Sequence, residues 1–274
     1  MGSAGSPARR DESRGRLKQL WIRLMQYQAA FSLPLELTFY QNCGDWLAAR
    51  SVADLGTGTG YYLTNLAHYF PSKTYTGVDH DPLYIRLAQR AARSASARHH
   101  PRVHFVWRDL FEIRGDFDFV IARLLVQHLN PLDAFFEHAR RLLRPNGTLL
   151  IIESDDRARR FVPELAALSK LFRTFRDSRR EAGYDRDAIL YGSERAKEFG
   201  LHLDTERRVI IPSALPGYKE LFARSYRTAT EIMRRNYGVS FDCEEVRGEL
   251  RRWLRAPGSY AQIGVYMASY RRRG

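Results

Sequence analysis

The sequence predicts an α/β fold, built on a doubly wound, mostly parallel seven-stranded sheet with an added helical lid. Three observations support this prediction. Short apolar runs alternate with amphipathic segments from residue 51 to about residue 154, a pattern typical of parallel strands joined by helices. A glycine-rich turn follows the first apolar run. The chain has 274 residues, 44% of them hydrophobic, which is enough for one large α/β domain.

The expected strands are short apolar segments bounded by turn residues. They cover residues 51–55, 73–78, 102–108, 117–122, 147–153, 201–211 and 262–270. Helices are expected between the earlier strands, at 62–70, 82–94 and 132–143. The helix at 82–94 has a clear start, because Asp81 is a good N-cap and Pro82 suits the first helical position.

Further helices are expected outside this core. They cover residues 16–31, 163–180, 187–199, 217–236 and 243–254. The segment between the last two strands has about 50 residues, too long for a simple loop. We therefore expect a disordered tail at 1–15, N-terminal lid helices at 16–45, and a core at 46–274 with helical lid insertions at about 156–183 and 213–260.

Composition narrows the function classes. The net charge of +13 comes from 39 arginines and 5 lysines against 31 acidic residues. Such a charge favours polyanionic partners, but the basic residues are spread along the chain, so nucleic-acid binding is the less favoured expectation. No apolar run reaches the roughly 20 residues that span a bilayer, and no charged-then-apolar leader opens the sequence. With only Cys43 and Cys243, we expect a cytoplasmic protein with reduced thiols and no membrane partner.

The turn VADLGTGTGYY, at 52–62, indicates the kind of ligand. Its glycines follow a GxGxG spacing. A dinucleotide site has the motif GxGxxG instead and binds a pyrophosphate at the helix N-terminus. Asp54 stands two residues before the first glycine, where a carboxylate would face a pyrophosphate badly. It would suit a ligand with a cationic end, and S-adenosylmethionine (SAM) carries an ammonium, a sulfonium and a carboxylate but no phosphate. Free N–H groups of the turn would take the ligand's carboxylate.

Several motifs in order resemble those of the class I SAM-dependent methyltransferases. They are DLGTGTG, YTGVDHD, VHFVWRDLFE, FDFVIARLLVQHLNP and RRLLRPNGTLLIIESD, and together they cover roughly residues 51–155. The resemblance is greatest to the branch that acts on small molecules and secondary metabolites. It implies a Rossmann-like fold, SAM as cofactor, S-adenosylhomocysteine (SAH) as product, and no metal.

The resemblance also implies which residues hold the cofactor. Asp79 would accept hydrogen bonds from both ribose hydroxyls, Asp109 would lie near the adenine amine with Leu110 as backbone donor, and Asp54 would hold the ammonium. The full cofactor set is Asp54, Gly56, Thr57, Gly58, Gly60, Asp79, His80, Asp109, Leu110, Arg123 and His128. Simpler interpretations are helix capping for Asp79 and Asp109, a solvated turn for Asp54, and a surface position for His80.

Methyl transfer from a sulfonium depends mainly on alignment of the acceptor, since the leaving group is already activated. A base helps only where the acceptor must lose a proton. The candidates for a catalytic role are His128, Asp155 and Tyr27. His128 has a cofactor-pocket or packing role as its alternative, and Asp155 a solvated loop. Tyr27 would reach the methionine end of the cofactor.

The absence of certain motifs narrows the range of acceptor molecules. No NPPY or DPPY follows the fourth strand and no Pro-Cys pair occurs, which disfavours methylation of adenine, glutamine or cytosine. Arg123 stands where a magnesium-dependent enzyme would want an acid. We therefore expect an N or O atom of a small molecule, for example a natural-product intermediate. The arginine-rich segment 157–180 would suit an anionic acceptor or be a solvated face. The alternatives are an RNA or protein methyltransferase and a SAM-binding enzyme that does not methylate, and a homodimer is left open.

Overall fold

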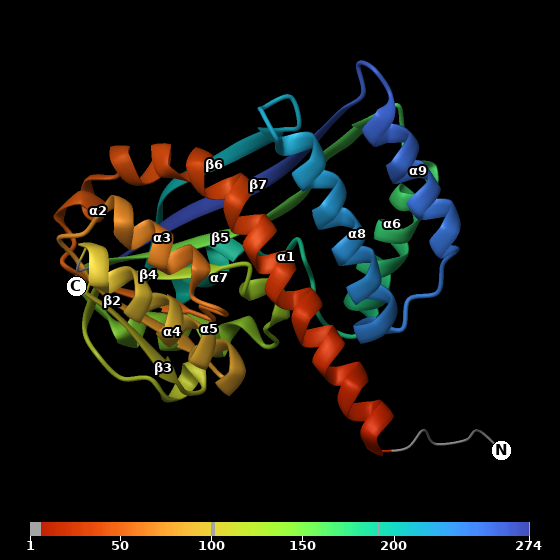
Figure 1. The fold of residues 1–274 in the computed structure, drawn as a ribbon. Coiled ribbons are helices and arrows are strands. Elements are labelled where there is room, and N and C mark those ends of the chain that lie inside the picture. Colours follow the sequence, from red (N-terminus) through yellow and green to blue (C-terminus); the bar gives the residue numbers. More distant parts are fainter. Residues whose placement is uncertain (1–6, 100–101, 191, 274) are drawn as a thin grey trace. The chain divides into compact units, whose positions relative to one another are not determined.

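The structure is a computed structural model that describes residues 7–99, 102–190 and 192–273 (Figure 1). The chain forms two compact units. The sheet unit comprises Ala29–Arg160, Arg176–Ile211 and Gln262–Gly274. The helical unit comprises Met1–Gln28, Phe161–Phe175 and Pro212–Ala261. Its three segments overlap the expected lid segments at 16–45, 156–183 and 213–260, but residues 29–45 and 176–183 belong to the sheet unit.

The sheet contains seven strands within the described residues. They are β1 Ser51–Leu55, β2 Thr74–Asp79, β3 Arg102–Trp107, β4 Phe117–Arg123, β5 Leu143–Val162, β6 Leu201–Pro212 and β7 Tyr260–Arg272. Their order is β3-β2-β1-β4-β5-β7-β6. The pairs β1–β2, β1–β4, β2–β3 and β4–β5 are parallel, and the sheet is mostly parallel with one antiparallel hairpin. The expected fold class is confirmed.

Strand β5 is much longer than the expected 147–153. It begins at Leu143 and continues through the polar run that follows Glu153 as far as Val162. This polar extension has partners on β6 and β7: Asp155 pairs with Arg208 of β6 at 3.1 Å, and Gln262 of the neighbouring strand β7 donates to the carbonyl of Ala158 at 3.0 Å. Because tertiary partners satisfy these polar groups, hydrophobicity alone did not indicate the strand.

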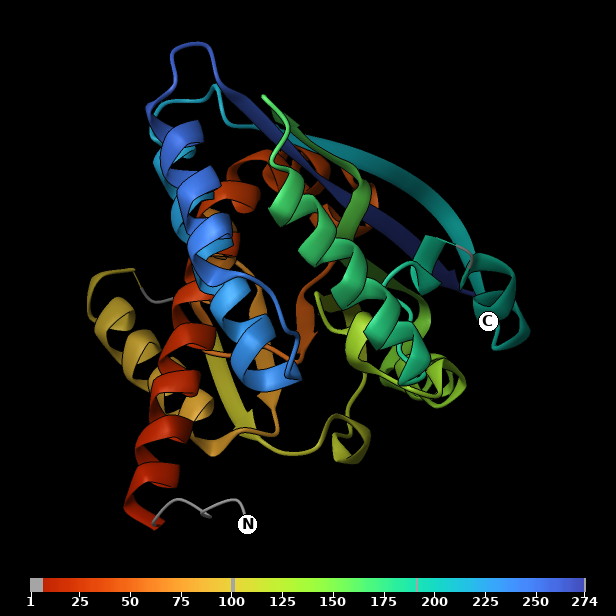
Figure 2. The same ribbon diagram turned by 90° about the vertical axis from the view of Figure 1, so that its right-hand side faces the viewer.

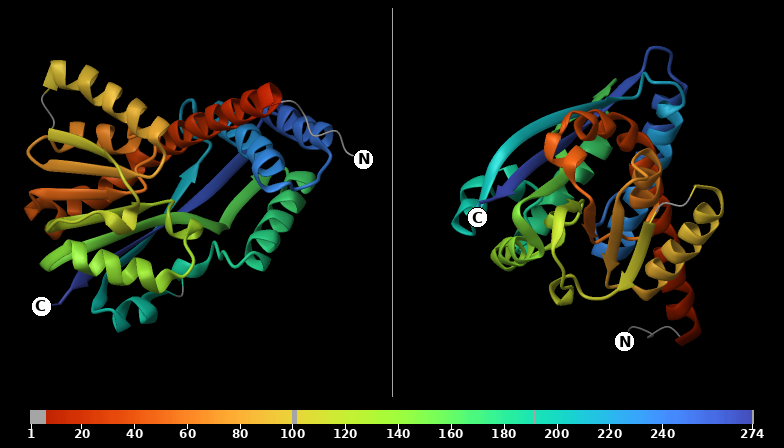
Figure 3. Two further views of the ribbon diagram at one scale, coloured as in Figure 1. Left: turned by 90° about the horizontal axis from the view of Figure 1, so that it is seen from below. Right: turned by 90° about the vertical axis from the view of Figure 1, so that its left-hand side faces the viewer.

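Most helices lie close to the expected ranges, but α1 extends well beyond its range and α2 was not expected. They are α1 Pro7–Asn42, α2 Gly44–Ala48, α3 Tyr61–Tyr69, α4 Pro82–His99, α5 Leu132–Leu142, α6 Ala166–Glu181, α7 Gly192–Glu198, α8 Tyr218–Tyr237 and α9 Cys243–Arg255, with short 3₁₀ turns η1 Leu110–Glu112, η2 Val126–His128 and η3 Ala188–Leu190. The helix expected at 187–199 is divided into η3 and α7. Figure 3 shows α4 and α5 on opposite faces of the sheet, as a doubly wound fold requires.

Helix α1 corrects the expected tail. It begins at Pro7, so the disorder expected for 1–15 does not hold from Pro7 onward; residues 1–6 lie outside the described residues. The helix also passes Phe31, where we expected it to end, and includes Pro34. Its last part belongs to the sheet unit, where Phe31, Leu33 and Leu37 are buried. Burial of these apolar side chains, rather than helix propensity, carries the helix past the proline.

The helical unit has an aromatic core of its own. Helices α8 and α9 run side by side (Figure 2). The ring of Tyr226 lies 5.0 Å from that of Phe161 and 5.5 Å from that of Phe172, centroid to centroid, and Trp253 is buried. These side chains pack against one another within the helical unit. Within the described residues, no helix is both long and apolar enough to cross a membrane.

Candidate cofactor-binding site

The predicted site lies where the strand order reverses. Strand β1 pairs with β2 on one side and with β4 on the other, so the chain winds away from β1 in both directions. In such sheets the crevice at the carboxyl ends of the strands is the usual ligand site. Asp54, Asp79 and Arg123 are at or next to the carboxyl ends of β1, β2 and β4, so the fold places these three predicted residues at one edge of the sheet.

The glycine turn depends on glycine for its backbone. Gly56, Gly58 and Gly60 have φ angles of 68°, 57° and 68°, a region that side-chain-bearing residues rarely adopt. Gly60 is also the N-cap of α3. A Cβ atom there would stand 2.5 Å from the ring of Phe105, so β3 packs directly against the turn.

Several N–H groups of the turn bond within the protein. Thr57 N–H donates to the carbonyl of Val78 at 2.9 Å, and Gly58 N–H donates to Oδ2 of Asp79 at 2.8 Å. Gly60 N–H donates to the carbonyl of Thr57 at 3.1 Å. We expected these groups to be free for the ligand's carboxylate. For Thr57, Gly58 and Gly60 this is not so, because the turn uses them to hold its own shape.

Asp79 is a fixed, nearly buried carboxylate. Its Oδ2 accepts from Gly58, and its Oδ1 accepts the N–H of Asp81 at 2.9 Å. Each oxygen keeps a second lone pair, so the carboxylate can still accept hydrogen bonds from a diol. The adjacent His80 side chain is exposed, with Nδ1 3.6 Å from Asp79 Oδ1. The indole of Trp107 donates to the carbonyl of His80 at 2.9 Å and fixes this segment, a contact that the sequence did not indicate.

Asp109 and Leu110 follow β3. Oδ1 of Asp109 accepts the N–H of Phe111 at 2.9 Å, so Asp109 caps the 3₁₀ turn η1. Leu110 is the first residue of that turn. Helix capping was the simpler interpretation of Asp109, and the geometry shows that it applies. A contact with adenine stays a prediction for both residues.

Asp54 is almost fully buried at the end of β1. Burial raises the pKa of its carboxyl to about 7, although the Thr57 hydroxyl and the Arg123 guanidinium act in the opposite direction. A cationic ligand would stabilise the ionised form of a carboxyl that is removed from water in this way. The solvated-turn interpretation of Asp54 is therefore wrong.

This pKa leads to a prediction about proton release. At pH 7 about half of the Asp54 carboxyls carry a proton in the free protein, and binding of an ammonium group should expel it. Titration calorimetry with SAH in two buffers of different ionisation enthalpy should show release of about half a proton at pH 7, falling towards zero at pH 8. Asp54→Asn should show no release. Equal heats in both buffers at pH 7 would contradict the prediction.

Arg123 belongs to a buried polar cluster that consists of Ser32, Glu36, Tyr40, Tyr62 and Arg123. Its Nη2 donates to Ser32 Oγ at 2.7 Å, its Nε lies 3.5 Å from Glu36 Oε2, and its guanidinium lies 4.4 Å from the ring centroid of Tyr62. The hydroxyls of Tyr40 and Tyr62 are 2.9 Å apart.

Sequence reasoning missed Glu36 and Tyr62. The available signal was a single acid in the otherwise apolar stretch LPLELTFY, at 33–40. Glu36 is completely buried and Tyr62 nearly so. The cluster adjoins the β1 strand end, because Arg123 is within electrostatic reach of Asp54.

A second polar network lies beside the predicted base. Glu153 of β5 accepts from the backbone N–H of Val126 at 2.7 Å and from Gln127 Nε2 at 2.9 Å. Burial raises the pKa of Glu153 to about 7. Arg186 links this network to Asp156: its Nη1 donates to the side-chain carbonyl of Gln127 and its Nε to Asp156 Oδ2 at 2.9 Å.

His128 has a solvent-accessible side chain at the end of η2. The protein atoms around its ring, and then the positive charges of Arg186 and Arg179, lower its pKa to about 4. The ring is therefore neutral at physiological pH. Asp155, the second candidate, is buried, and its carboxylate is engaged by Arg208 and by the N–H of Arg157 at 3.2 Å. Tyr27 belongs to the helical unit, whereas His128 and Asp155 belong to the sheet unit.

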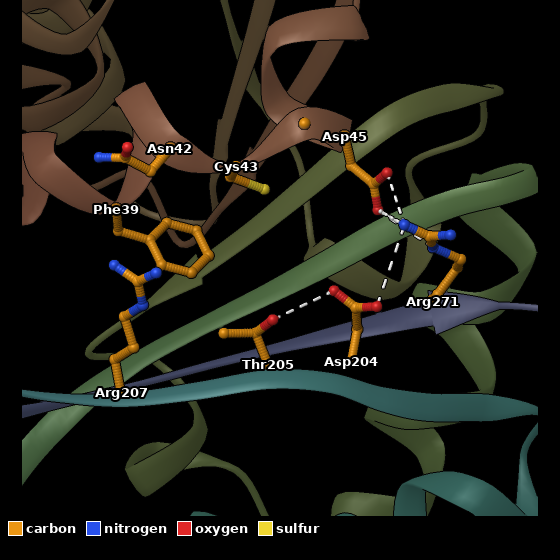
Figure 4. A pocket seen from close by; sticks show the side chains of 9 residues that line it. Phe39, Asn42, Cys43, Asp45, Asp204, Thr205, Arg207 and Arg271 are labelled. Carbon is orange, nitrogen blue, oxygen red and sulfur yellow. Dashed lines mark hydrogen bonds and ion pairs between the residues drawn. The ribbon is translucent and has the colours of Figure 1, made fainter.

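A hollow in the sheet unit is lined by none of the predicted site residues (Figure 4). It is lined by Phe39, Asn42, Cys43, Gly44, Asp45, Asp204, Thr205, Arg207 and Arg271. Both of its acids pair with one arginine, since Arg271 lies 2.7 Å from Asp45 and 3.9 Å from Asp204. The hydroxyl of Thr148 also donates to Asp45 at 2.8 Å.

The strand order and the acids at the ends of β1 and β2 define the fold of class I SAM-dependent methyltransferases. Residues 53–149 match the family model described as a methyltransferase domain. This part of the chain is a class I SAM-dependent methyltransferase domain.

Curated relatives match this chain over just above 100 residues each. Trans-aconitate 2-methyltransferase of Deinococcus radiodurans is 32% identical over 104 residues, which are 36% of this chain and 36% of the relative. Malonyl-(acyl-carrier protein) O-methyltransferase of Halalkalibacterium halodurans is 27% identical over 107 residues, 37% of this chain and 38% of the relative. The chain thus matches little more than a third of these relatives.

Solved structures share the fold over a larger part of the chain. The cyclase SpnF aligns with a TM-score of 0.51 and 17% identity, over 82% of this chain and 75% of its own. Phosphoethanolamine N-methyltransferase 2 of Haemonchus contortus, solved with phosphomonomethylethanolamine and SAH, aligns with a TM-score of 0.50 and 19% identity, over 82% and 49%. At these identities the likeness shows the fold alone.

The residues at the strand ends fit the cofactor that the family implies. Asp79 presents a carboxylate oriented by two N–H groups, as a ribose diol requires. Asp54 is a buried acid with a raised pKa, as a cationic group requires. The chemistry of the donor set therefore agrees with SAM as cofactor, and the contacts of Asp79 with the ribose and of Asp54 with the methionine end stay predictions.

Proposed function

We propose that this protein transfers a methyl group from SAM to a small-molecule acceptor, and that the acceptor atom is a carboxylate oxygen. The observation that supports SAM is the pair of acids, Asp54 and Asp79, placed at the switch point around the glycine turn. When bound, SAM supplies an electrophilic methyl group on a positively charged sulfur. The protein's part is to hold the two reactants in line.

The charges beside His128 support an anionic acceptor. Arg186 and Arg179 are close enough to lower the pKa of His128, and Arg159 lies 3.7 Å from Asp156 in the same network. Arginine binds carboxylates through two parallel N–H groups. Trans-aconitate and malonyl groups, which the names of the two relatives contain, also carry carboxylates.

A carboxylate acceptor needs no general base. It has lost its proton at neutral pH, so no group has to remove one. Alignment of the two reactants can lower the activation barrier by at most about 7–11 kcal/mol. His128, neutral because of its lowered pKa, would then orient the acceptor or the methionine end rather than remove a proton. Asp155 is held by Arg208, which favours a structural role. Catalytic roles for His128, Asp155 and Tyr27 remain predictions.

The direct test uses SAM with a labelled methyl group and a panel of mono-, di- and tricarboxylic acids, free and as acyl thioesters. We expect SAH formation together with labelled methyl ester that alkali hydrolyses. Label stable to alkali would indicate an N-methyl or ether product and would overturn the carboxylate. Absence of SAM and SAH binding in calorimetry would overturn the proposal as a whole. Steep loss of acceptor turnover with salt would favour the polyanion alternative.

Arg179 provides a prediction about acceptor binding. Arg179→Gln should raise the KM for the carboxylate acceptor about tenfold, since a charge-assisted contact contributes about 1.5–3 kcal/mol. The Kd for SAH should stay within twofold. Arg141→Gln is the matched control, because Arg141 pairs with Glu137 of its own helix and is largely exposed. Steady-state kinetics with the acceptor found above measures both, and an unchanged KM would contradict the anionic-acceptor proposal.

A further inference from the structure

Glu36 is a buried carboxylate without a hydrogen-bond donor. Its side chain is 0% exposed, and neither Oε1 nor Oε2 has a hydrogen-bond partner among the residues that the structure describes. Its ion-pair partner is Arg123, whose Nε lies 3.5 Å from Oε2. A buried carboxylate in this situation is costly unless a further positive group approaches it.

Arg123 connects Glu36 to the end of the site where the methionine part of the cofactor is expected. Glu36 pairs with Arg123, the last residue of β4, and Arg123 also feels the charge of Asp54 at the end of β1. The following residue, Leu124, has a φ angle of 52°, a strained conformation for leucine. Such strain often occurs at ligand sites. Glu36 itself comes from α1, outside residues 53–149 that match the family model.

The charges of Asp54, Glu36 and Arg123 suggest which group of the cofactor Glu36, the second acid, recognises. Asp54 and Glu36 are two buried carboxylates set against one guanidinium, that of Arg123. Once a cationic ligand has expelled the Asp54 proton, an ionised Asp54 and an ionised Glu36 together carry one negative charge more than Arg123 compensates. The methionine end of SAH has one ammonium and one carboxylate, which a single acid and a single guanidinium would match. SAM has an additional positive charge on sulfur, and only the second carboxylate matches it.

We propose that Glu36 recognises the sulfonium charge and gives the pocket a preference for SAM over SAH. This inference rests on the proposed function and concerns the same site. The second acid adds electrostatic attraction only while the sulfur carries its methyl group. After transfer the sulfur is neutral, and the attraction between Glu36 and the product is weaker. Glu36 thereby favours exchange of product for fresh cofactor.

Calorimetry without acceptor tests the preference. The wild type should bind SAM more tightly than SAH. Glu36→Gln, which keeps the shape of the side chain, should weaken SAM binding about tenfold, about 1.4 kcal/mol, and SAH binding less than threefold. Sinefungin, in which a carbon atom that carries an ammonium group replaces the methylated sulfur, should follow SAM. Glu36→Asp, which keeps the charge, should keep the order of affinities. Glu137→Gln, on an exposed face of α5, is the control and should change neither Kd.

Each outcome separates the inference from the function on which it rests. Equal weakening of SAM and SAH by Glu36→Gln would mean that Glu36 only supports the pocket or binds the shared ammonium, and would overturn the inference. A wild type that binds SAH as tightly as SAM and sinefungin would also overturn it, and this comparison decides the matter if Glu36→Gln does not fold. A wild type that binds none of the three ligands would refute the proposed function instead.

Discussion

Replacing Asp79 with asparagine should weaken SAH binding by about 100-fold. Asp79 accepts one N–H from Gly58 and one from Asp81, and under the proposed function it also accepts two ribose hydroxyls. Asparagine removes the charge and turns one acceptor oxygen into a donor that faces an N–H group. Hydrogen bonds to charged groups contribute about 1.5–3 kcal/mol each, and a loss of about 2.7 kcal/mol corresponds to 100-fold.

Asp118→Asn is the matched control for this measurement. Asp118 also accepts backbone N–H groups, those of Arg50 and Ser51 at 2.8 Å each, but it is near the beginning of β4, away from the carboxyl ends of the strands. Its replacement should lower the melting temperature and leave the Kd for SAH within twofold. Calorimetry of both variants decides the matter: similar affinities for Asp79→Asn and the wild type would remove Asp79 from the cofactor site.

Gly60→Ala should destabilise the protein by about 3 kcal/mol. The positive φ angle of 68° is strained for alanine and costs about 1–2 kcal/mol. The new Cβ would also stand 2.5 Å from the Phe105 ring and 2.7 Å from Ala88, and relief of such overlap typically costs about 1–3 kcal/mol more. The melting temperature should fall by about 8 °C.

Gly258→Ala separates the two causes. Gly258 has nearly the same φ angle, 69°, but a Cβ added there would have no atom of the described residues within 4 Å. It should lose only the conformational part, about 1 kcal/mol, with a fall of about 3 °C. Thermal unfolding of the ligand-free variants measures both. Equal losses would show that the contact between the glycine turn and β3 does not contribute.

Much of the fold could be predicted because its signals are local. The strands β1, β2 and β4 are apolar runs inside the sheet, β3 lies at its edge, and each of the four is bounded by turn residues. The start of α4 was predicted at Pro82 from Asp81, whose Oδ1 accepts the N–H of Leu83 at 2.8 Å. Two boundaries were missed where tertiary contacts outweigh local pattern, at β5 beyond Glu153 and in α1 around Pro34.

The acids of the candidate site could be predicted from the sequence, but the hydrogen bonds of its glycine turn could not. Asp54 and Asp79 follow apolar runs, and the carboxyl ends of parallel strands meet at one edge, so their proximity follows from the sequence order. The use of Thr57, Gly58 and Gly60 N–H groups within the turn was not predictable, because the partners of Thr57 and Gly58 come from β2. That the three helical segments act as a lid stays a prediction.

The sequence by itself determined the fold class, the family resemblance and the acids at the strand ends, since hydrophobic periodicity and motif order are written in consecutive residues. Only the tertiary structure placed Glu36 of α1 beside Arg123 of β4, 87 positions further along the chain. Burial there is a property of the packed sheet unit, and a buried carboxylate such as Glu36 is costly unless positive groups lie close to it.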